Sequence, residues 1–500
     1  MLDNILLGLE AALSFEALVY CFLAVTLGTF IGVMPGIGAL ATISLLLPIT
    51  YYMDPTISII MIAGIYYGSA YGGSTASILL NVPGQASAAV VCLDGYPMAK
   101  QGRAGVALFA CAVGSFVGAM IGVAILILFS PFIAELGLSF GPAEFFSLIL
   151  LGLVAASCVA SGSALKSLAM VVAGLLIGTV GTDINSGTPR FHFGILELRD
   201  GIGLVAVAMG LFGVTEVIRS INNVPASTRH SDVTLRSMLP TREDVKRSIM
   251  PTLRGAGLGS FFGALPGSGM DIASFTSYAV EKRVAKDPSR FGKGAIEGVI
   301  APETANNAAG QTAFIPALTL GIPANAVMAL ILGGLIIHGI TPGPELITKE
   351  PQLFWGLIVS FVVGNIMLLI LNLPLISIWV RMLLIPYNIL YPIIVIVMCF
   401  GVFSVNNNIF DVFLTAIFGV IGYGMFLLRF EPAPLLLGLV LGPMLEERMV
   451  RALVISGGDA TVFFTRPLSG VLLVCTALLL AWIVWDSMRS KPGEMQGLAG

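Results

Sequence analysis

The sequence predicts an all-α polytopic membrane protein with roughly 10–12 transmembrane helices, inverted-topology repeats and broken or re-entrant helical hairpins. The composition, the apolar runs and the distribution of basic residues lead to this fold class. Of the 500 residues, 57% are hydrophobic and 11% are charged, and the mean hydropathy is +0.96. Soluble domains carry about a quarter charged residues, so the composition excludes a soluble protein.

The apolar segments have the length of membrane-spanning helices. Only helical bundles and closed barrels satisfy their backbone polar groups within lipid. A barrel would show short alternating segments, whereas the apolar run that begins at Val106 continues unbroken to Phe129. At about 20 residues per span, the apolar runs allow roughly ten to twelve crossings of the membrane.

Charge and motifs exclude several functional classes. The net charge of −3 argues against nucleic-acid binding, which needs a basic face. The sequence lacks the GxxxxGK[ST] loop of an ATPase and the HExxH and GxSxG motifs of hydrolases. We therefore expect no enzymatic activity and no cofactor.

The cysteines and histidines do not indicate a metal site. The six cysteines lack CxxC spacing, and we interpret them as small hydrophobic residues packed between helices. They are Cys21, Cys92, Cys111, Cys158, Cys399 and Cys475. The three histidines also lack metal-ligand spacing. They are His192, His230 and His338. No transition-metal site is expected.

The basic residues predict the topology. None precedes Lys100, whereas seven lie between Arg219 and Arg254, and a second group follows between Lys282 and Lys293. Basic loops stay in the cytoplasm, so both segments should be cytoplasmic. We expect a first transmembrane repeat half over residues 1–220, a cytoplasmic linker over 221–254, a second half over 255–430, and C-terminal membrane segments over 431–500.

One motif occurs twice. GTFIGVMPGIG begins at Gly28 and GSFFGALPGSG begins at Gly259, and four glycines and a proline match at one constant offset of 231 residues (259 − 28). The first copy has no basic residues beside it, whereas basic loops flank the second on both sides. Two copies of one motif, one without basic flanking residues and one with them, predict inverted repeats. We expect broken or re-entrant hairpins over residues 28–50 and 259–280. For the second copy, a straight span with a proline kink is the alternative.

Each copy is followed by a second interrupted apolar segment. The first is broken at Pro83 and Gly84, and the second at Pro316 and again at Pro323. Proline removes a backbone donor, and glycine lets the chain turn without steric cost. The freed backbone groups need partners in lipid, and a solute and an ion can supply them.

We expect a carboxylate solute between these segments, where half-helix N-termini meet polar side chains. The candidate substrate-binding residues are Ser74, Thr75, Pro83, Gly84, Asn306, Asn307, Gln311 and Thr312. The alternative is that the small polar residues only let helices pack closely.

A cation is expected at the two PGxG breaks, where unwound carbonyl groups suit Na⁺. The candidate ion-binding residues are Pro35, Gly36, Gly38, Pro266, Gly267, Ser268 and Gly269. These segments contain no Lys or Arg, so a co-bound Na⁺ would supply the charge that a carboxylate needs. Protons are the alternative coupling ion.

Three carboxylates have open roles. Glu303 lies in an apolar run beside Pro302. An intramembrane carboxylate is a functional candidate by default, but Glu303 could also cap the start of a half-helix. The same two alternatives apply to Asp271 and Asp459.

Several segments closely resemble the large membrane subunit of tripartite tricarboxylate transporters. They are GTFIGVMPGIGALATISLLLPIT, YYGSAYGGSTASILLNVPG, DGYPMAKQGRAG, FFGALPGSG, KGAIEGVIAPETANNAAGQTAFIPALTLGIP and LGPMLEERMVRALVISGGD. The resemblance extends from about Gly28 to Pro467, which is nearly the whole chain, and the APETANNA string is specific to the family.

The resemblance implies a multi-pass protein of the bacterial inner membrane. It implies a small membrane subunit and a periplasmic solute-binding protein as partners, and ion-driven uptake of tricarboxylates or other small carboxylates with sodium as the coupling ion. The alternative is a non-transporting membrane protein, either an enzyme acting on a lipid-linked substrate or a structural subunit.

Overall fold

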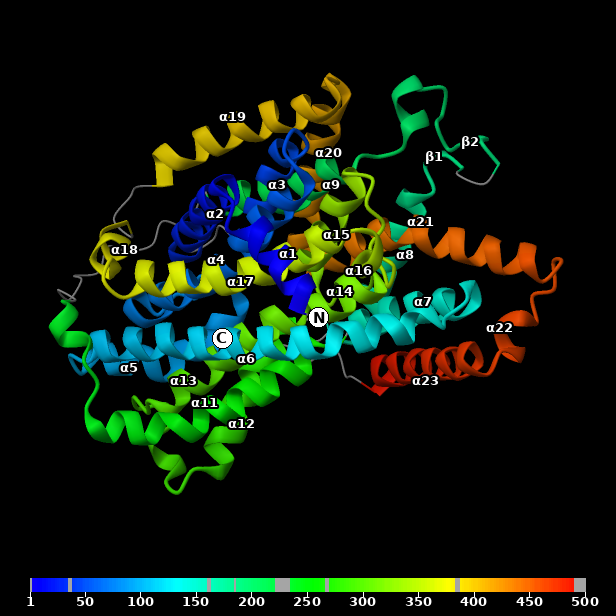
Figure 1. Cartoon of the computed structure of the whole chain (residues 1–500). Helices are drawn as coiled ribbons and strands as arrows, with labels where there is room; N and C mark the ends of the chain where they lie inside the picture. Colours follow the sequence, from blue (N-terminus) through cyan, green and yellow to red (C-terminus); the bar gives the residue numbers. More distant parts are fainter. Residues whose placement is uncertain are drawn as a thin grey trace.

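A computed structural model describes residues 2–34, 38–159, 163–183, 186–220, 234–265, 269–382 and 387–489. Helices make up nearly all of the described chain (Figure 1). The two short strands that it contains, β1 (Gly181–Thr182) and β2 (Pro189–Arg190), pair antiparallel in a loop. The all-α prediction is confirmed.

The first part of the chain forms ten helices within the described residues. They are α1 (Leu2–Ala12), α2 (Phe15–Val33), α3 (Ala39–Thr50), α4 (Pro55–Leu80), α5 (Ala89–Lys100), α6 (Ala104–Leu138), α7 (Pro142–Val159), α8 (Ala164–Gly178), α9 (Leu204–Ala208) and α10 (Thr215–Ser220). A π-helical turn at Met209–Val214 lies between α9 and α10.

The second part of the described chain begins at residue 234. Its helices are α11 (Arg242–Gly263), α12 (Gly269–Val284), α13 (Glu297–Thr312), α14 (Phe314–Leu320), α15 (Ala326–Ile337), α16 (Leu346–Lys349), α17 (Pro351–Asn372), α18 (Ile376–Met382), α19 (Tyr387–Asn406), α20 (Ile409–Leu427), α21 (Pro432–Ile455), α22 (Val462–Thr465) and α23 (Pro467–Arg489).

Among the described residues, five helices are long and apolar enough to cross a membrane: α2, α6, α17, α20 and α23. Shorter apolar helices accompany them, including α3 and α15. The chain is therefore a multi-pass membrane protein. The expected count of roughly ten to twelve crossings stays a prediction.

Two helices lie at the centre of the molecule. α4 is buried on every side from residue 57 to residue 78, and α13 is buried from 298 to 312. A helix that is buried all round needs neighbours on every face. α2, α5 and α17 pack on α4, whereas α11, α12 and α6 pack on α13.

In the first half, α2 packs directly on the backbone of α4. A Cβ atom at Gly28 would collide with the carbonyl oxygen of Ile65, and one at Gly32 would collide with that of Ser69. Glycines at such positions let two helices approach closely in a membrane.

The second half repeats this contact. A Cβ atom at Gly259 of α11 would collide with the carbonyl oxygen of Ala305 of α13, and one at Gly263 would collide with that of Ala309. The two glycines of α11 come 231 residues after the two glycines of α2 (259 − 28). The residues of α13 that they contact come 240 residues after the residues of α4 that the first pair contacts (305 − 65). The duplication seen in the sequence is therefore also a duplication of packing.

The second breaks match in the same way. Asn81 is the C-cap of α4 and has a left-handed φ of 57°. Gly321 is the C-cap of α14 and has a left-handed φ of 71°. The offset is again 240 residues (321 − 81). A proline follows two residues after each left-handed position, at Pro83 and Pro323, and a new helix then begins.

α11 and α12 form the predicted hairpin. Arg254 of α11 donates two hydrogen bonds to Glu281 of α12, with Nε–Oε1 and Nη2–Oε2 distances of 2.5 and 2.7 Å. The two helices therefore run side by side in opposite directions beside α13 (Figure 1). The first copy is likewise interrupted between α2 and α3. The opposite membrane orientation of the two copies stays a prediction.

Two boundaries differ in detail from those expected. α11 begins at Arg242, within the expected linker, because Thr241 and Asp244 form a capping box there. The helix before Pro316 is interrupted at Ala313, three residues earlier than the proline. Proline has no N–H group to donate to the carbonyl four residues before it, and its ring clashes with that carbonyl. The helix is therefore interrupted before the proline.

Asp94 of α5 ties the two halves together. Its Oδ1 accepts backbone hydrogen bonds from Gly292, Gly294 and Ala295 at 2.8–2.9 Å, and its Oδ2 accepts one from the Tyr278 hydroxyl at 3.0 Å. The buried carboxylate therefore fixes the loop between α12 and α13 against the first half.

We predict that Gly259→Ala destabilises the protein by about 1–3 kcal/mol, because the methyl group would force α11 away from α13. Gly257→Ala is the matched control in the same helix, since nothing lies within 4 Å of a Cβ atom at that position. Thermal unfolding of the purified variants in detergent measures the difference. Equal unfolding midpoints for the two variants would contradict the packing described here.

Candidate functional site

A large cavity, with a volume of about 700 Å³, lies where the four breaks meet. Residues 38–40 and 269–272 line it, and these are the equivalent helix starts after the two PGxG motifs. The turns at 85–87 and 324–327 line it as well, and these are the equivalent segments after the second breaks. The remaining lining residues are Tyr66, Ala156, Phe275, Thr276, Glu431, Ala433, Pro434 and Leu437.

Four helices of at least twelve residues begin at this cavity: α3, α12, α15 and α21. The first N–H groups of a helix have no partner within the helix, and they carry a partial positive charge. At α3 the capping position is Gly38, which has no side chain to occupy these donors. The arrangement therefore suits an anion.

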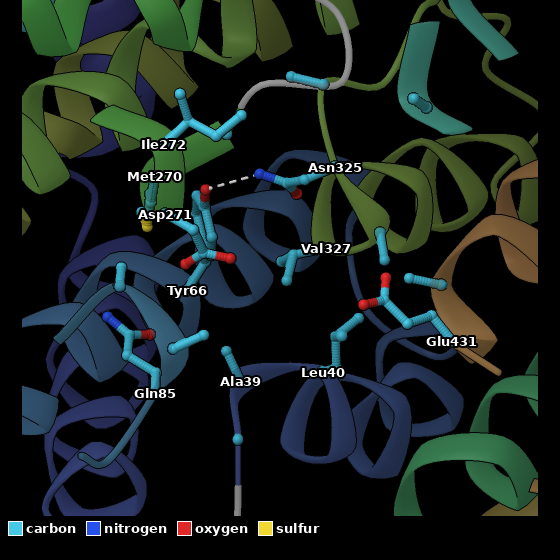
Figure 2. Close-up of a pocket in the computed structure, with 18 of the residues that line it drawn as sticks. Ala39, Leu40, Tyr66, Gln85, Met270, Asp271, Ile272, Asn325, Val327 and Glu431 are labelled. Atoms are coloured by element: carbon cyan, nitrogen blue, oxygen red, sulfur yellow. Dashed lines mark hydrogen bonds between the residues drawn. The ribbon is translucent and has the colours of Figure 1, made fainter. Parts of the chain in front are cut away.

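Neutral polar side chains complete the cavity wall. Figure 2 shows Asn325 reaching across to Tyr66, and its Nδ2 donates a hydrogen bond to the Tyr66 hydroxyl at 3.2 Å. The Oδ1 of Asn325 also caps α15 by accepting from the Met328 N–H at 2.9 Å. On the opposite wall, the buried Nε2 of Gln85 has no hydrogen-bond partner among the described residues.

The cavity contains carboxylates but no basic side chain among its described lining residues. Asp271 lies in the first turn of α12 and Glu431 precedes α21, so each carboxylate lies near a positive helix end. Both face the cavity in Figure 2. An anion bound here would need a cation or a proton to balance its charge.

A second polar cluster surrounds Glu303 of α13. The carboxylate is 1% exposed. It accepts hydrogen bonds from Ser74 of α4 at 2.5 Å, from Ser115 of α6 at 2.8 Å and from the Nδ2 of Asn307 at 3.1 Å. No described Lys, Arg or His forms an ion pair with it.

Several buried amides near Glu303 lack partners. Both polar atoms of Asn306, the Oδ1 of Asn307 and both polar atoms of Gln311 make no hydrogen bond within the described chain. Asn306 approaches the Glu303 carboxylate without completing a hydrogen bond. Buried polar atoms without partners are rare in native structures and need a partner such as a bound water or ion.

The predicted substrate residues do not all lie at one site in the structure. Ser74 and Asn307 meet at Glu303, and Gln311 lies on the same helix. Thr75 is buried in α4, and Thr312 is buried in α13, where its hydroxyl donates to the Ala308 carbonyl. The described lining of the large cavity includes none of the eight predicted substrate residues. Gly84 is buried and Pro83 is exposed, just before the cavity residue Gln85.

The predicted ion-binding residues lie at the same cavity where they are described. Gly38 and Gly269 line it at the starts of α3 and α12. Pro35, Gly36, Pro266, Gly267 and Ser268 lie outside the described residues. Of the other candidates, Asp459 is exposed in the loop after α21, where it accepts a hydrogen bond from the Thr461 N–H. Within the described residues, no cluster of His, Cys, Asp and Glu could hold a metal.

Sequence reasoning missed Tyr66, Gln85, Asn325 and Ser115. Gln85 and Asn325 carried a usable signal, because an amide residue stands two positions after the proline of each second break. Reading the two halves at an offset of 240 residues would have paired them. Ser115 carried none, since it is one small residue in a long apolar helix.

The fold and the cavity define a multi-pass membrane protein with two copies of a broken-helix unit around one polar site. Comparison with known families agrees: residues 18–437 match the tripartite tricarboxylate transporter TctA family. The chain belongs to this family, which is a family of transporters.

Two relatives come from Agrobacterium vitis. One, named an uncharacterized 52.8 kDa protein in the TAR-I ttuC′ 3′ region, is 50% identical over 492 residues, covering 98% of each chain. The other, named an uncharacterized protein in the TAR-II ttuC′ 3′ region, is 57% identical over 241 residues, covering 47% of this chain and 98% of the relative. No solved structure matches the chain.

We predict that the cavity is reached by water. In a variant without the native cysteines, Thr276→Cys should react with a hydrophilic thiol reagent, because Thr276 lines the cavity. Ala273→Cys is the control: it lies three residues earlier in α12 and is 0% exposed. The rate at position 276 should be at least about tenfold higher, and equal rates at the two positions would argue that the cavity is closed.

Proposed function

We propose that this chain is the large membrane subunit of a secondary transporter that imports small carboxylates, tricarboxylates among them, and that the carboxylate binds in the large cavity. One observation carries the proposal: two broken segments from each repeat bring three helix starts to one cavity of about 700 Å³. Its volume is within the range of small-molecule sites. Membership of the TctA family supports transport.

The cavity donors suit a carboxylate. The uncapped start of α3 offers backbone N–H groups, and Gln85 offers a side-chain N–H that has no other described partner. Sites for secondary transport commonly lie at interrupted helices whose N-terminal ends point at the anionic group of the solute. Which carboxylate enters would be set largely by the partner that delivers it.

Charge balance supports a coupling cation, for which we propose sodium. A carboxylate in a low-dielectric site costs several kcal/mol per charge unless a countercharge is present. The described lining offers none from Lys or Arg, and Asp271 and Glu431 add negative charge. A co-bound Na⁺ would supply it, and linkage requires that solute and ion then tighten each other's binding by the same factor. The PGxG breaks remain candidate ion-binding positions.

The family supports the wider assembly. A tripartite transporter has two further components, and we expect a small membrane subunit and a periplasmic solute-binding protein. Basic segments flank the α11–α12 hairpin, so we expect its open end in the cytoplasm. We therefore expect insertion in the bacterial inner membrane with the two repeats in opposite orientations.

The test is carboxylate uptake into vesicles reconstituted with all three subunits. Asn325→Asp and Asn325→Ser both keep an oxygen that caps α15, but only Asp adds a negative charge beside the solute. We predict that Asp raises the apparent KM for the carboxylate at least about tenfold more than Ser. Equal effects would move the solute away from this cavity. Absence of uptake by the assembled wild-type complex would favour a non-transporting protein.

A second prediction concerns the driving ion. With the sodium gradient collapsed and the proton gradient kept, uptake should fall to the passive rate, because no ion flow would then offset accumulation of the anion. Initial rates of labelled carboxylate uptake measure this in the same vesicles. Undiminished uptake under these conditions would assign the coupling to protons.

A further inference from the structure

We propose that Glu303, Ser74, Ser115 and Asn307 form a binding site for one dehydrated alkali cation of the size of sodium. This site is separate from the cavity that receives the carboxylate. The site joins the two repeats, since Ser74 belongs to α4 and Glu303 to α13. Its role as the coupling site rests on the proposed function, whereas the binding of the cation does not.

The charge of Glu303 is the first argument. The carboxylate is buried among α4, α6 and α13, and its hydrogen-bond donors are two hydroxyls and one amide, all of them neutral. An ionised group in such surroundings is strongly disfavoured without an opposite charge. No described basic side chain supplies that charge, so a bound cation would.

The ligand set is the second argument. Two carboxylate oxygens and the hydroxyl oxygens of Ser74 and Ser115 lie within one hydrogen-bonded cluster, and hydroxyl groups can turn their lone pairs towards a cation. Asn306 and Asn307 each add a buried amide oxygen that has no partner in the described chain. Oxygen ligands without sulfur or imidazole suit a hard cation. One carboxylate matches one positive charge.

A proton alone would neutralise Glu303, but the single O–H group could donate to only one of the unpaired amide oxygens of Asn306 and Asn307. A cation accounts for both the buried charge and the unpaired oxygens. This is the reason that the cluster favours an alkali cation over a simple protonation site.

The helices that carry the cluster also contact the cavity wall. The side chain of Gln85 packs against Gly73, the residue that precedes Ser74. On the other side, Met270 and Tyr66 of the cavity wall lie against Gly310 of α13. A cation that draws α4 and α13 together would therefore act on both walls of the cavity, which gives a route by which ion and solute affect each other.

The experiment uses the purified full-length chain in detergent, with no carboxylate and no partner present. Equilibrium binding of ²²Na⁺ and the thermal stabilisation by NaCl relative to choline chloride are measured. Wild type should bind sodium and be stabilised by it, whereas Glu303→Gln should lose both effects. Asp459→Asn, which removes an exposed carboxylate outside the cluster, should behave like wild type.

Ser115→Ala keeps the carboxylate and tests the site even if Glu303→Gln fails to fold. Loss of a ligand to a charged centre should weaken sodium binding about 10- to 100-fold. Sodium binding by Ser115→Ala and by folded Glu303→Gln at wild-type affinity would overturn the proposal, as would absence of sodium binding by wild type. Because solute is absent, failure here is separate from failure of carboxylate transport in the reconstituted complex.

Discussion

The close approach of helix backbones determines the arrangement of this protein. In lipid, helices gain little from burying apolar side chains against one another, so packing and hydrogen bonds hold them together. Gly28 and Gly32 let α2 lie on the carbonyl groups of α4, and two equivalent glycines let α11 lie on α13. These contacts leave α4 and α13 buried on all sides, and they hold the ends of the broken helices at the centre of the molecule.

The breaks determine the chemistry of that centre. Each interruption frees backbone groups that cannot be left unpaired in lipid. The structure collects the starts of α3, α12 and α15 at one cavity, together with Tyr66, Gln85 and Asn325. The described wall therefore presents helix N–H groups and amide side chains, together with the carboxylates of Asp271 and Glu431 and without a Lys or Arg.

Charge compensation links the cavity to the cluster around Glu303. The cavity offers hydrogen-bond donors to an anion, and a bound anion there would need a cation. The cluster offers oxygen atoms around the carboxylate of Glu303, which has no described basic partner. Both include residues of α4, Met270 and Tyr66 of the cavity wall lie against Gly310 of α13, and Gln85 touches the glycine next to Ser74. A conformational change that both ligands influence needs such a shared element, since each ligand can act only through contacts that differ between the two states.

The sequence by itself determined the membrane class, the helical fold and the PGxG duplication, because hydropathy and a short repeated motif are local properties. The hairpin of α11 and α12 followed from the basic residues at both of its ends. The sequence did not pair Asn81 with Gly321, since the two residues differ in type and share only a left-handed backbone. Nor did it bring Ser115 to Glu303, 188 residues away. Only the tertiary packing decided these contacts, because the meeting of two side chains on different helices depends on the rotation and depth of each helix, and no local pattern records either.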